Sequence, residues 1–254
     1  MVLGIDEAGR GPALGAMVMA AVAVDPVGAR RLTRAGVADS KSFGAGPEAH
    51  EKRLALYEIV CAHAAWIAID VCDVEVVDAY VARGALNVLE RERATAFIRA
   101  APPCRRIIAD GHRLFGSLTA EFPHLEARDR AESHHVAVAA ASICAKVRRD
   151  ELFACIAARY AADFGPVTGG GYVNAATRAF ARAYVRRHGA LPPEARHSWP
   201  WQGVRTGKRP PRRASSEGDA ASGDASALLT GGAVERGARG VDASTDGAPA
   251  GRAA

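Results

Sequence analysis

Residues 1–12 read MVLGIDEAGRGP, an apolar run followed by two acidic residues and a glycine-rich turn. Residues 1–5 form a short apolar run that predicts a buried β-strand. Asp6 and Glu7 stand side by side where that run ends, and a turn with two glycines and one arginine follows at residues 9–11. A lone acidic residue after a strand is usually a turn former or a helix cap. An adjacent pair beside a basic turn also suits a binding site, so other acidic residues must decide between these interpretations.

The composition indicates a protein with a hydrophobic core and a small net positive charge. Of the 254 residues, 49% are hydrophobic, which is enough for a core, and only 6% are aromatic, so Ala, Val, Leu and Ile must build most of it. The net charge of +5 is compatible with a polyanion partner but too small to argue for one alone. The five cysteines show no CxxC spacing, which is typical of a reducing cytoplasm. No apolar run reaches the roughly 18 residues of a membrane span, so we expect a cytoplasmic protein with no membrane partner.

The composition changes near residue 204 and divides the chain. Residues 1–204 carry the apolar patterns of a folded domain. Residues 205–254 are rich in Gly, Ala, Ser, Pro and Asp, and such a segment cannot bury enough apolar surface to offset its ordering entropy. We expect a disordered low-complexity tail, whose basic run GKRPPRR at residues 207–213 is either a solvated linker or a non-specific phosphate contact.

Strands and helices alternate along residues 1–204. Continuous or period-two apolar patterns predict strands, and apolar residues at helical spacing predict helices. Interleaved strands and helices indicate an α/β domain. The predicted strands are residues 1–5, 13–24, 65–72 and 104–110, and the predicted helices are residues 76–100, 136–162 and 176–189.

Acidic residues at strand ends indicate one common site. Asp6 and Glu7 end the first predicted strand, and Asp110 ends the fourth. Sites in open α/β sheets gather at strand ends, so we expect these carboxylates to converge. Converging carboxylates repel one another unless cations lie between them, and hard oxygen ligands suit Mg²⁺ or Mn²⁺. A pair of such ions can activate water and stabilise the leaving oxygen in phosphodiester hydrolysis.

The turn Gly9–Arg10–Gly11, called the GRG turn below, lies next to the first two carboxylates. Glycines let a backbone approach a ligand closely, and amides in such a turn can donate to phosphate or hydroxyl oxygens. Alone it is an ordinary turn. Beside a carboxylate cluster it suits a sugar-phosphate backbone.

Six motifs follow one another in unbroken order from about residue 2 to about residue 201. The most specific is GIDEAGRGP at residues 4–12. The others are VADSK (37–41), ALNVLERE (85–92), IIADG (107–111), AAASICAKVRRDE (139–151), and GGGY with the following TRAFARAYVRRHGALPP (169–172 and 177–193). Together they resemble the ribonuclease HII family, the type 2 ribonucleases H.

The resemblance implies a ribonuclease H-like fold, in which a central mixed sheet is flanked by helices and a small helical C-terminal region covers about residues 165–204. It also implies a metal-dependent endoribonuclease that uses Mn²⁺ or Mg²⁺. Such an enzyme hydrolyses the RNA strand of RNA–DNA hybrids. It also incises DNA 5′ of embedded ribonucleotides, leaving 3′-hydroxyl and 5′-phosphate ends, and so acts in ribonucleotide removal during replication and repair.

The resemblance assigns roles to individual residues. Asp6, Glu7 and Asp110 would be catalytic metal ligands, and the GRG turn, Gly9, Arg10 and Gly11, would read the 2′-hydroxyl that separates RNA from DNA. Tyr172 would stack on the sugar next to the ribonucleotide. The residues that match positions near the phosphates are Ser40, Lys41, Ser142 and Lys146.

The fourth carboxylate departs from the family. Its usual aspartate stands seven residues before the SAAS motif, where this chain has Glu132, which is longer by one methylene. Asp129 is the rival, but it lies three residues too early. We expect Glu132 to be the fourth catalytic metal ligand, and Asp150 at the end of the motif to be structural. The alternatives are a hybrid-binding protein that has lost catalysis and a nuclease of the same fold that cleaves only long hybrids.

Other candidate groups have simpler explanations. His112, His134 and His135 flank the carboxylates, but they lack an H-x-x-x-H spacing or a cysteine partner. We therefore expect histidines that lie on the surface or behind the metal ligands rather than a zinc site. Trp199 and Trp201 could stack on bases, but we expect them to pack the C-terminal region. No Q-x-x-hydrophobic motif with paired aromatics closes the chain. The sequence therefore gives no support for a sliding-clamp partner, and we expect a monomer.

Overall fold

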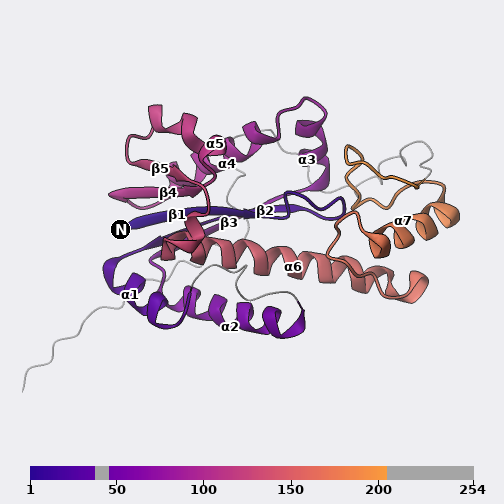
Figure 1. Ribbon diagram of the computed structural model, residues 1–254, viewed down its shortest axis with the longest axis horizontal. Helices are drawn as coiled ribbons and strands as arrows, with labels where there is room; N and C mark the ends of the chain where they lie inside the picture. Colours follow the sequence, from indigo (N-terminus) through magenta and orange to yellow (C-terminus); the bar gives the residue numbers. More distant parts are fainter. Residues whose placement is uncertain (38–45, 205–254) are drawn as a thin grey trace, which may run out of the picture.

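The computed structural model describes residues 1–37 and 46–204, which form a five-stranded sheet with helices on both faces (Figure 1). The strand order is β3-β2-β1-β4-β5. β2 is antiparallel to both β1 and β3, β4 runs parallel to β1, and β5 runs parallel to β4. The predicted mixed sheet flanked by helices is therefore confirmed. In chain order the elements are β1 (Val2–Ala8), β2 (Met17–Val24), α1 (Pro26–Arg34), α2 (Pro47–His63), β3 (Trp66–Cys72), α3 (Val74–Val81), α4 (Leu86–Ala100), β4 (Arg106–Asp110), α5 (His112–Phe115), β5 (Leu125–Arg128), α6 (Val136–Phe164) and α7 (Ala175–His188).

Strand β2 divides the core into two layers. Its sequence MVMAAVAV is buried at every position. The even-numbered residues join the core formed with α1, α2 and α6, and the odd-numbered residues from Met19 to Ala23 join the core formed with α4 and α5. Figure 1 shows these two groups of helices on opposite faces of the sheet. A strand covered on both faces reads as a continuous apolar run, so the sequence predicted it readily.

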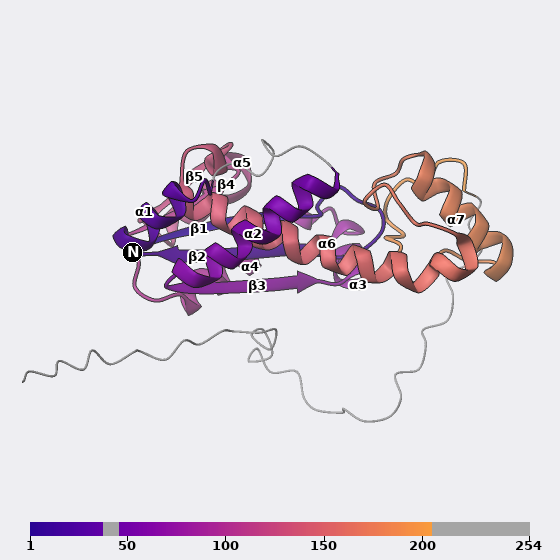
Figure 2. The same cartoon turned by 90° about the horizontal axis from the view of Figure 1, so that it is seen from below.

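Helix α6 packs directly onto β1. A Cβ added at Gly4 would lie 2.2 Å from the backbone carbon of Ala137, so only glycine admits the helix at this depth. The first turns of α6 are mainly buried alanines, whose small side chains keep the helix close to the sheet. Figure 2 shows α6 running beside α2 and on past the sheet toward α7. The close approach of α6 brings Ser142 to the end of β1.

The structure corrects three predicted boundaries. Residues 76–100 are not one helix but α3 and α4, because the chain turns between them at Gly84, whose φ is +65°. β1 continues to Ala8, so Asp6 and Glu7 lie within the strand rather than after it. The second strand begins at Met17, because residues 13–16 belong to a loop tied to the C-terminal region.

Both ends of α7 lie at residues that are typical helix caps. Asn174 caps its first turn by accepting from the Thr177 amide at 3.0 Å, and Gly189 ends it with φ +75°. The predicted tail from residue 205 lies outside the described residues. Within the described part of the chain, no helix combines the length and the apolar character needed to cross a membrane.

Candidate active site

The register of two parallel strands brings the acidic residues together. Ile5 of β1 lies opposite Ala109 of β4, and β4 ends at the next residue, Asp110. Asp6 therefore lies beside Asp110 at the point where the pairing stops, while β1 continues to Ala8 with β2 alone as its partner. The parallel direction of the two strands makes their carboxyl ends meet, as expected from the sequence.

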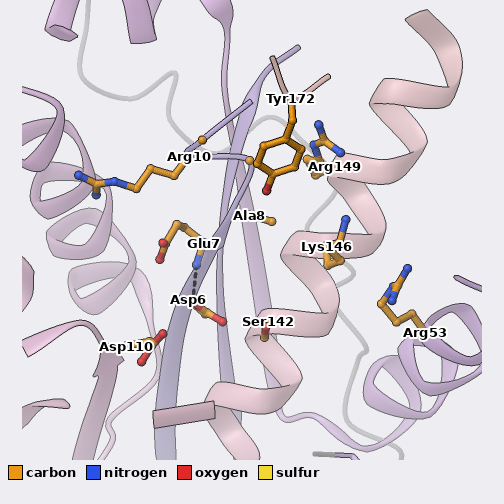
Figure 3. Close-up of a pocket in the computed structure, with 12 residues that line it drawn as sticks. Asp6, Glu7, Ala8, Arg10, Arg53, Asp110, Ser142, Lys146, Arg149 and Tyr172 are labelled. Atoms are coloured by element: carbon orange, nitrogen blue, oxygen red, sulfur yellow. Dashed lines mark hydrogen bonds between the residues drawn. The ribbon is translucent and has the colours of Figure 1, made fainter. Parts of the chain in front are cut away.

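A cleft of about 440 Å³ opens at this strand end (Figure 3). It contains most of the residues predicted for the site. Ser40 and Lys41 lie outside the described residues, and Glu132 lies next to Asp110 without lining the cleft. The lining residues are Asp6, Glu7, Ala8, Gly9, Arg10, Gly11, Arg53, Asp110, Ser142, Lys146, Arg149 and Tyr172.

Asp6 is the most buried acidic residue of the cleft, with 5% of its surface exposed. One of its oxygens accepts from the Glu7 amide at 2.8 Å, and Ser142 of α6 hydrogen-bonds to its side chain. Burial raises the pKa of Asp6 well above its usual value, and repulsion from Glu7 and Asp110 raises it further. The two hydrogen bonds oppose this shift without cancelling it.

Glu132 is the acidic residue that lies against Asp110. It is buried in a short 3₁₀ helix, Ala131–Ser133, and its carboxyl hydrogen-bonds to Asp110, which also accepts from the Ala131 amide at 2.8 Å. Burial, together with the neighbouring Glu132 carboxyl, raises the pKa of Asp110 to about 6. The rival Asp129 is exposed and accepts from the His112 amide at 2.8 Å. The structure therefore places Glu132, not Asp129, beside Asp110.

The donor set fits a hard divalent cation, although the side chains are not gathered around one point. In residues 1–37 and 46–204, no three His, Cys, Asp or Glu side chains form an arrangement that would hold a metal ion. Asp6, Glu7 and Asp110 nevertheless repel one another in a buried setting, where the effective dielectric constant is low. A cation among these oxygens would offset the repulsion. His112 and His134 are exposed, as expected for surface histidines, whereas His135 is half-buried.

A buried arginine that the sequence analysis missed holds the GRG turn in place. Arg196 is fully buried, and its guanidinium donates to the carbonyls of Gly15, Arg10 and Gly9 at 2.9, 3.0 and 2.6 Å. Burial lowers the pKa of Arg196 to about 10, which leaves it charged at neutral pH. No sequence motif distinguishes this arginine from those on the surface.

The two C-terminal tryptophans pack, as expected. Trp201 is buried and donates from Nε1 to the Arg196 carbonyl at 2.9 Å. Trp199 lies against the Arg196 guanidinium and donates from Nε1 to the Gly11 carbonyl at 2.9 Å. Together with Arg196, Trp199 fixes the carbonyl side of the GRG turn from the C-terminal region.

The side chain of Arg10 points away from Tyr172 (Figure 3). Its guanidinium forms an ion pair with Glu90 and donates to Asn87 Oδ1 at 2.6 Å, and both partners belong to α4. Glu90 is fully buried, and burial raises its pKa to about 7 although Arg10 lies against it. With its arginine held by α4, the GRG turn can offer mainly backbone groups to the cleft.

Tyr172 stands over the GRG turn. A Cβ added at Gly11 would lie 3.2 Å from Cε1 of the tyrosine ring, and the residue is 54% exposed. The preceding residue, Gly171, accepts from the amides of Ala13 and Leu14 at 2.9 and 3.1 Å. The tyrosine and the GRG turn are therefore held in a common frame.

Cations from two helices form the side of the cleft opposite the carboxylates (Figure 3). Lys146 and Arg149 come from α6, and Arg53 comes from α2. Asp150 lies 2.6 Å from Lys146 Nζ and 3.7 Å from Arg53 Nη2, which supports the structural role expected for it. The Arg149 guanidinium donates to the Gly170 carbonyl. Arg53 and Arg149 could not be predicted from the sequence, because their roles depend on how α2 and α6 pack.

Comparisons with known proteins agree with this arrangement. The family model described as Ribonuclease HII matches residues 3–201. Ribonuclease HII from Halobacterium salinarum strain R1 is 36% identical over 213 residues, covering 77% of this chain and 90% of that relative.

Two solved structures share the fold. The crystal structure of the ribonuclease H2 from Pyrococcus horikoshii OT3 superposes with a TM-score of 0.68 at 24% identity, covering 79% of this chain and 94% of that one. The ribonuclease HII solved in a complex with PCNA from Archaeoglobus fulgidus superposes with a TM-score of 0.64 at 28% identity, covering 78% and 93%.

Proposed function

Because the chain belongs to the ribonuclease HII family and is therefore an endoribonuclease of RNA–DNA hybrids, we propose that it also incises duplex DNA on the 5′ side of a single embedded ribonucleotide. The products would carry 3′-hydroxyl and 5′-phosphate ends, and the reaction would serve ribonucleotide removal during replication and repair. One observation supports the proposal above others. Three acidic residues (Asp6, Glu7 and Asp110), the GRG turn and Tyr172 line the same cleft, so cleavage and sugar recognition can act on neighbouring nucleotides.

We assign the metal-binding role to Asp6, Glu7, Asp110 and Glu132. Members of the family depend on divalent metal ions, and the crowded carboxylates of this chain suit Mn²⁺ or Mg²⁺. When bound, such ions supply an activated water and stabilise charge on the leaving oxygen. Ser142 orients Asp6 through its hydrogen bond, so we assign it a supporting role.

The opposite side of the cleft would position the phosphates. Lys146 and Arg53 face the carboxylates across the cleft, and Arg and Lys contacts to phosphate fix register without reading sequence. With cations held by the carboxylates, the scissile phosphate of a strand in the cleft would lie between the acidic side and the basic side. Arg53 therefore joins Lys146 as a proposed substrate contact.

Backbone groups of the GRG turn would read the 2′-hydroxyl. Arg196 and Trp199 engage the carbonyls of the turn and fix its orientation. A polar site built for a hydroxyl rejects a sugar that lacks it, because its buried polar groups are then left unpaired. The exposed face of Tyr172 would stack on the next sugar and keep it in register.

Two substitutions at Tyr172 test the recognition. Tyr172→Ala should lower incision at a single ribonucleotide about 5- to 150-fold, since a stacked ring contributes roughly 1–3 kcal/mol. Tyr172→Phe should retain most of the activity because the ring remains. Cleavage of a long RNA–DNA hybrid is the companion measurement, and an equal loss on both substrates in the alanine variant would count against a sugar-reading role.

Substitutions at Glu132 and Asp129 test which of the two residues is the fourth metal ligand. Glu132→Gln should reduce cleavage at least about a hundredfold, because a lost ligand removes stabilisation of transition-state charge. Asp129→Asn, the matched control, should stay close to the parent activity. Unchanged cleavage in Glu132→Gln would remove Glu132 from the metal site.

We propose that the protein acts on hybrids and ribonucleotide-containing duplexes as a monomer. The Archaeoglobus relative was solved in a complex with PCNA, and this proposal does not depend on such a partner. Sedimentation at the concentrations used for activity would show a single monomeric species. A dimer there would contradict this part of the proposal.

A further inference from the structure

Helix α7 carries a line of positive charge that the site described above does not use. Arg178, Arg182 and Arg186 recur at every fourth position, so they share one side of the helix, and we call them the α7 stripe. Arg182 and Arg186 are exposed, and Arg178 is half-buried. At 1.5 Å per residue, the stripe extends over about 12 Å. Residues 175–188 include no acidic residue that could neutralise it.

The α7 stripe has no carboxylate partner within residues 1–37 and 46–204. Neighbouring arginines do have one: Arg187 lies 2.8 Å from Asp163 near the end of α6. Phe180, Tyr184 and His188 pack against the α6 rings of Tyr160 and Phe164. With 3.6 residues per turn, the stripe lies on the side of α7 away from these contacts. Three arginines without counter-ions on one helix side leave a surface that suits a polyanion.

The stripe begins beside the cleft. Nη1 of Arg178 lies 3.5 Å from the carbonyl oxygen of Val173, the residue that follows Tyr172. From there α7 runs outward past the end of the sheet (Figures 1 and 2). A nucleic acid that passes over the exposed Tyr172 ring would therefore meet Arg178 first.

We propose that the α7 stripe binds the sugar-phosphate backbone of the duplex arm that leaves the cleft on the Tyr172 side. Guanidinium groups match phosphate oxygens in geometry and charge. A length of about 12 Å corresponds to the axial rise of three to four nucleotides of one strand. Backbone contacts carry no sequence information, so the stripe sets affinity and placement, whereas the GRG turn selects the sugar.

The test compares two triple substitutions that remove the same charge. One replaces Arg178, Arg182 and Arg186 by Gln. The matched control replaces the exposed Arg30, Arg31 and Arg34 of α1, which lies at the opposite end of the molecule (Figure 1). Binding to a DNA duplex with one central ribonucleotide is measured in EDTA, which prevents cleavage, over a range of salt concentrations.

The stripe variant should bind about tenfold more weakly at physiological salt. Its plot of log affinity against log salt should be shallower by up to about 3, since each neutralised phosphate contributes about 0.9. The α1 control should change that slope by less than about 1. Equal slopes for the two variants would overturn the proposal, because the effect would then be one of net charge alone.

Duplexes trimmed on one arm or the other locate the contact. Removing the arm on the Tyr172 side should weaken binding by the parent protein. It should also abolish the difference in affinity between the parent protein and the stripe variant. Removing the other arm should preserve that difference. A loss of affinity that is the same on both trimmed duplexes would also overturn the proposal.

Incision kinetics with Mn²⁺ separate this proposal from the proposed function on which it rests. The stripe variant should raise KM about tenfold on the full duplex and keep kcat within about twofold, because the lost contacts act on binding. Failure of the proposed function would appear as no incision by the parent protein. A double variant, Arg182→Gln with Arg186→Gln, replaces only exposed side chains and should show about two-thirds of the slope change. No slope change in this folded double variant would contradict the stripe.

Discussion

Arg10 of the GRG turn and Glu90 of α4 form an ion pair in which only one partner can reach water. The Glu90 side chain is fully buried, whereas 39% of the Arg10 side chain is exposed. If Glu90 is removed, the guanidinium can turn to solvent. If Arg10 is removed, the carboxylate stays buried without its counter-ion. The two residues therefore differ in what their loss should cost.

Arg10→Ala should destabilise the protein more than Glu90→Gln. The pKa of Glu90 is already about 7, so without Arg10 the buried carboxyl takes up a proton, and we expect Arg10→Ala to lose about 1–3 kcal/mol in the free energy of unfolding, the cost of a buried polar group without its partner. Glu90→Gln should lose less than about 1.5 kcal/mol. Urea unfolding measures both, with Glu92→Gln as a control because Glu92 lies on the same helix and bonds only the exposed Tyr80 hydroxyl. Equal losses in the free energy of unfolding for the two substitutions would contradict the difference in burial between Glu90 and Arg10.

Arg196→Lys should fail as a conservative substitution. A lysine cannot reproduce the fork of donors that reaches three carbonyls around the GRG turn, so we expect a lower melting temperature and at least about a tenfold loss in kcat/KM at a single ribonucleotide. Arg34→Lys on α1 is the control, since Arg34 is exposed. Parent-like activity in Arg196→Lys would show that the orientation of the turn does not depend on this arginine.

Gly4→Ala should be strongly destabilising although it adds one methyl group. The new Cβ would lie 2.2 Å from the Ala137 backbone. Because this neighbour is backbone, the clash can be relieved only by moving α6 away from β1. We expect a loss of at least about 3 kcal/mol in the free energy of unfolding. Gly116→Ala is the matched control, because a Cβ there meets nothing within 4 Å and should change stability by less than about 1 kcal/mol. A tolerated Gly4→Ala would mean that α6 does not pack at this depth.

Divalent ions should stabilise the folded protein through the acidic residues. Mn²⁺ or Mg²⁺ binds the native cleft and not the unfolded chain, so the melting temperature should rise with ion concentration. Asp6→Asn removes one of the buried, mutually repelling carboxylates. It should raise the melting temperature without metal, by the equivalent of about 1 kcal/mol, and remove most of the ion-dependent rise. A lower metal-free melting temperature in Asp6→Asn would show that repulsion is not significant there.

Most of the sheet could be predicted from the sequence, because its central strands are buried on both faces. β2 is a continuous apolar run, and such runs are easily recognised. The edge strand β5 was not predicted, since it has four residues of which only Leu125 is buried. The break between α3 and α4 was missed because Gly84 lies within an apolar pattern that is otherwise helical.

The acidic part of the site was predictable, and the parts built by tertiary packing were not. Asp6 and Asp110 each end an apolar run, and the parallel register then places them together. Arg196 gives no such signal, because its role arises from contacts with carbonyls more than 180 residues earlier in the chain. The side-chain direction of Arg10 could not be predicted either, since the buried position of Glu90 on α4 decides it.

The most direct test of this account is incision of a DNA duplex that carries one ribonucleotide, beside an all-DNA duplex, with Mg²⁺ and then with Mn²⁺. We expect a single cut on the 5′ side of the ribonucleotide, leaving a 3′-hydroxyl and a 5′-phosphate, and no cut in the all-DNA duplex. Tight binding without cleavage in either metal would contradict it, and would mean that Glu132 does not complete the acidic site.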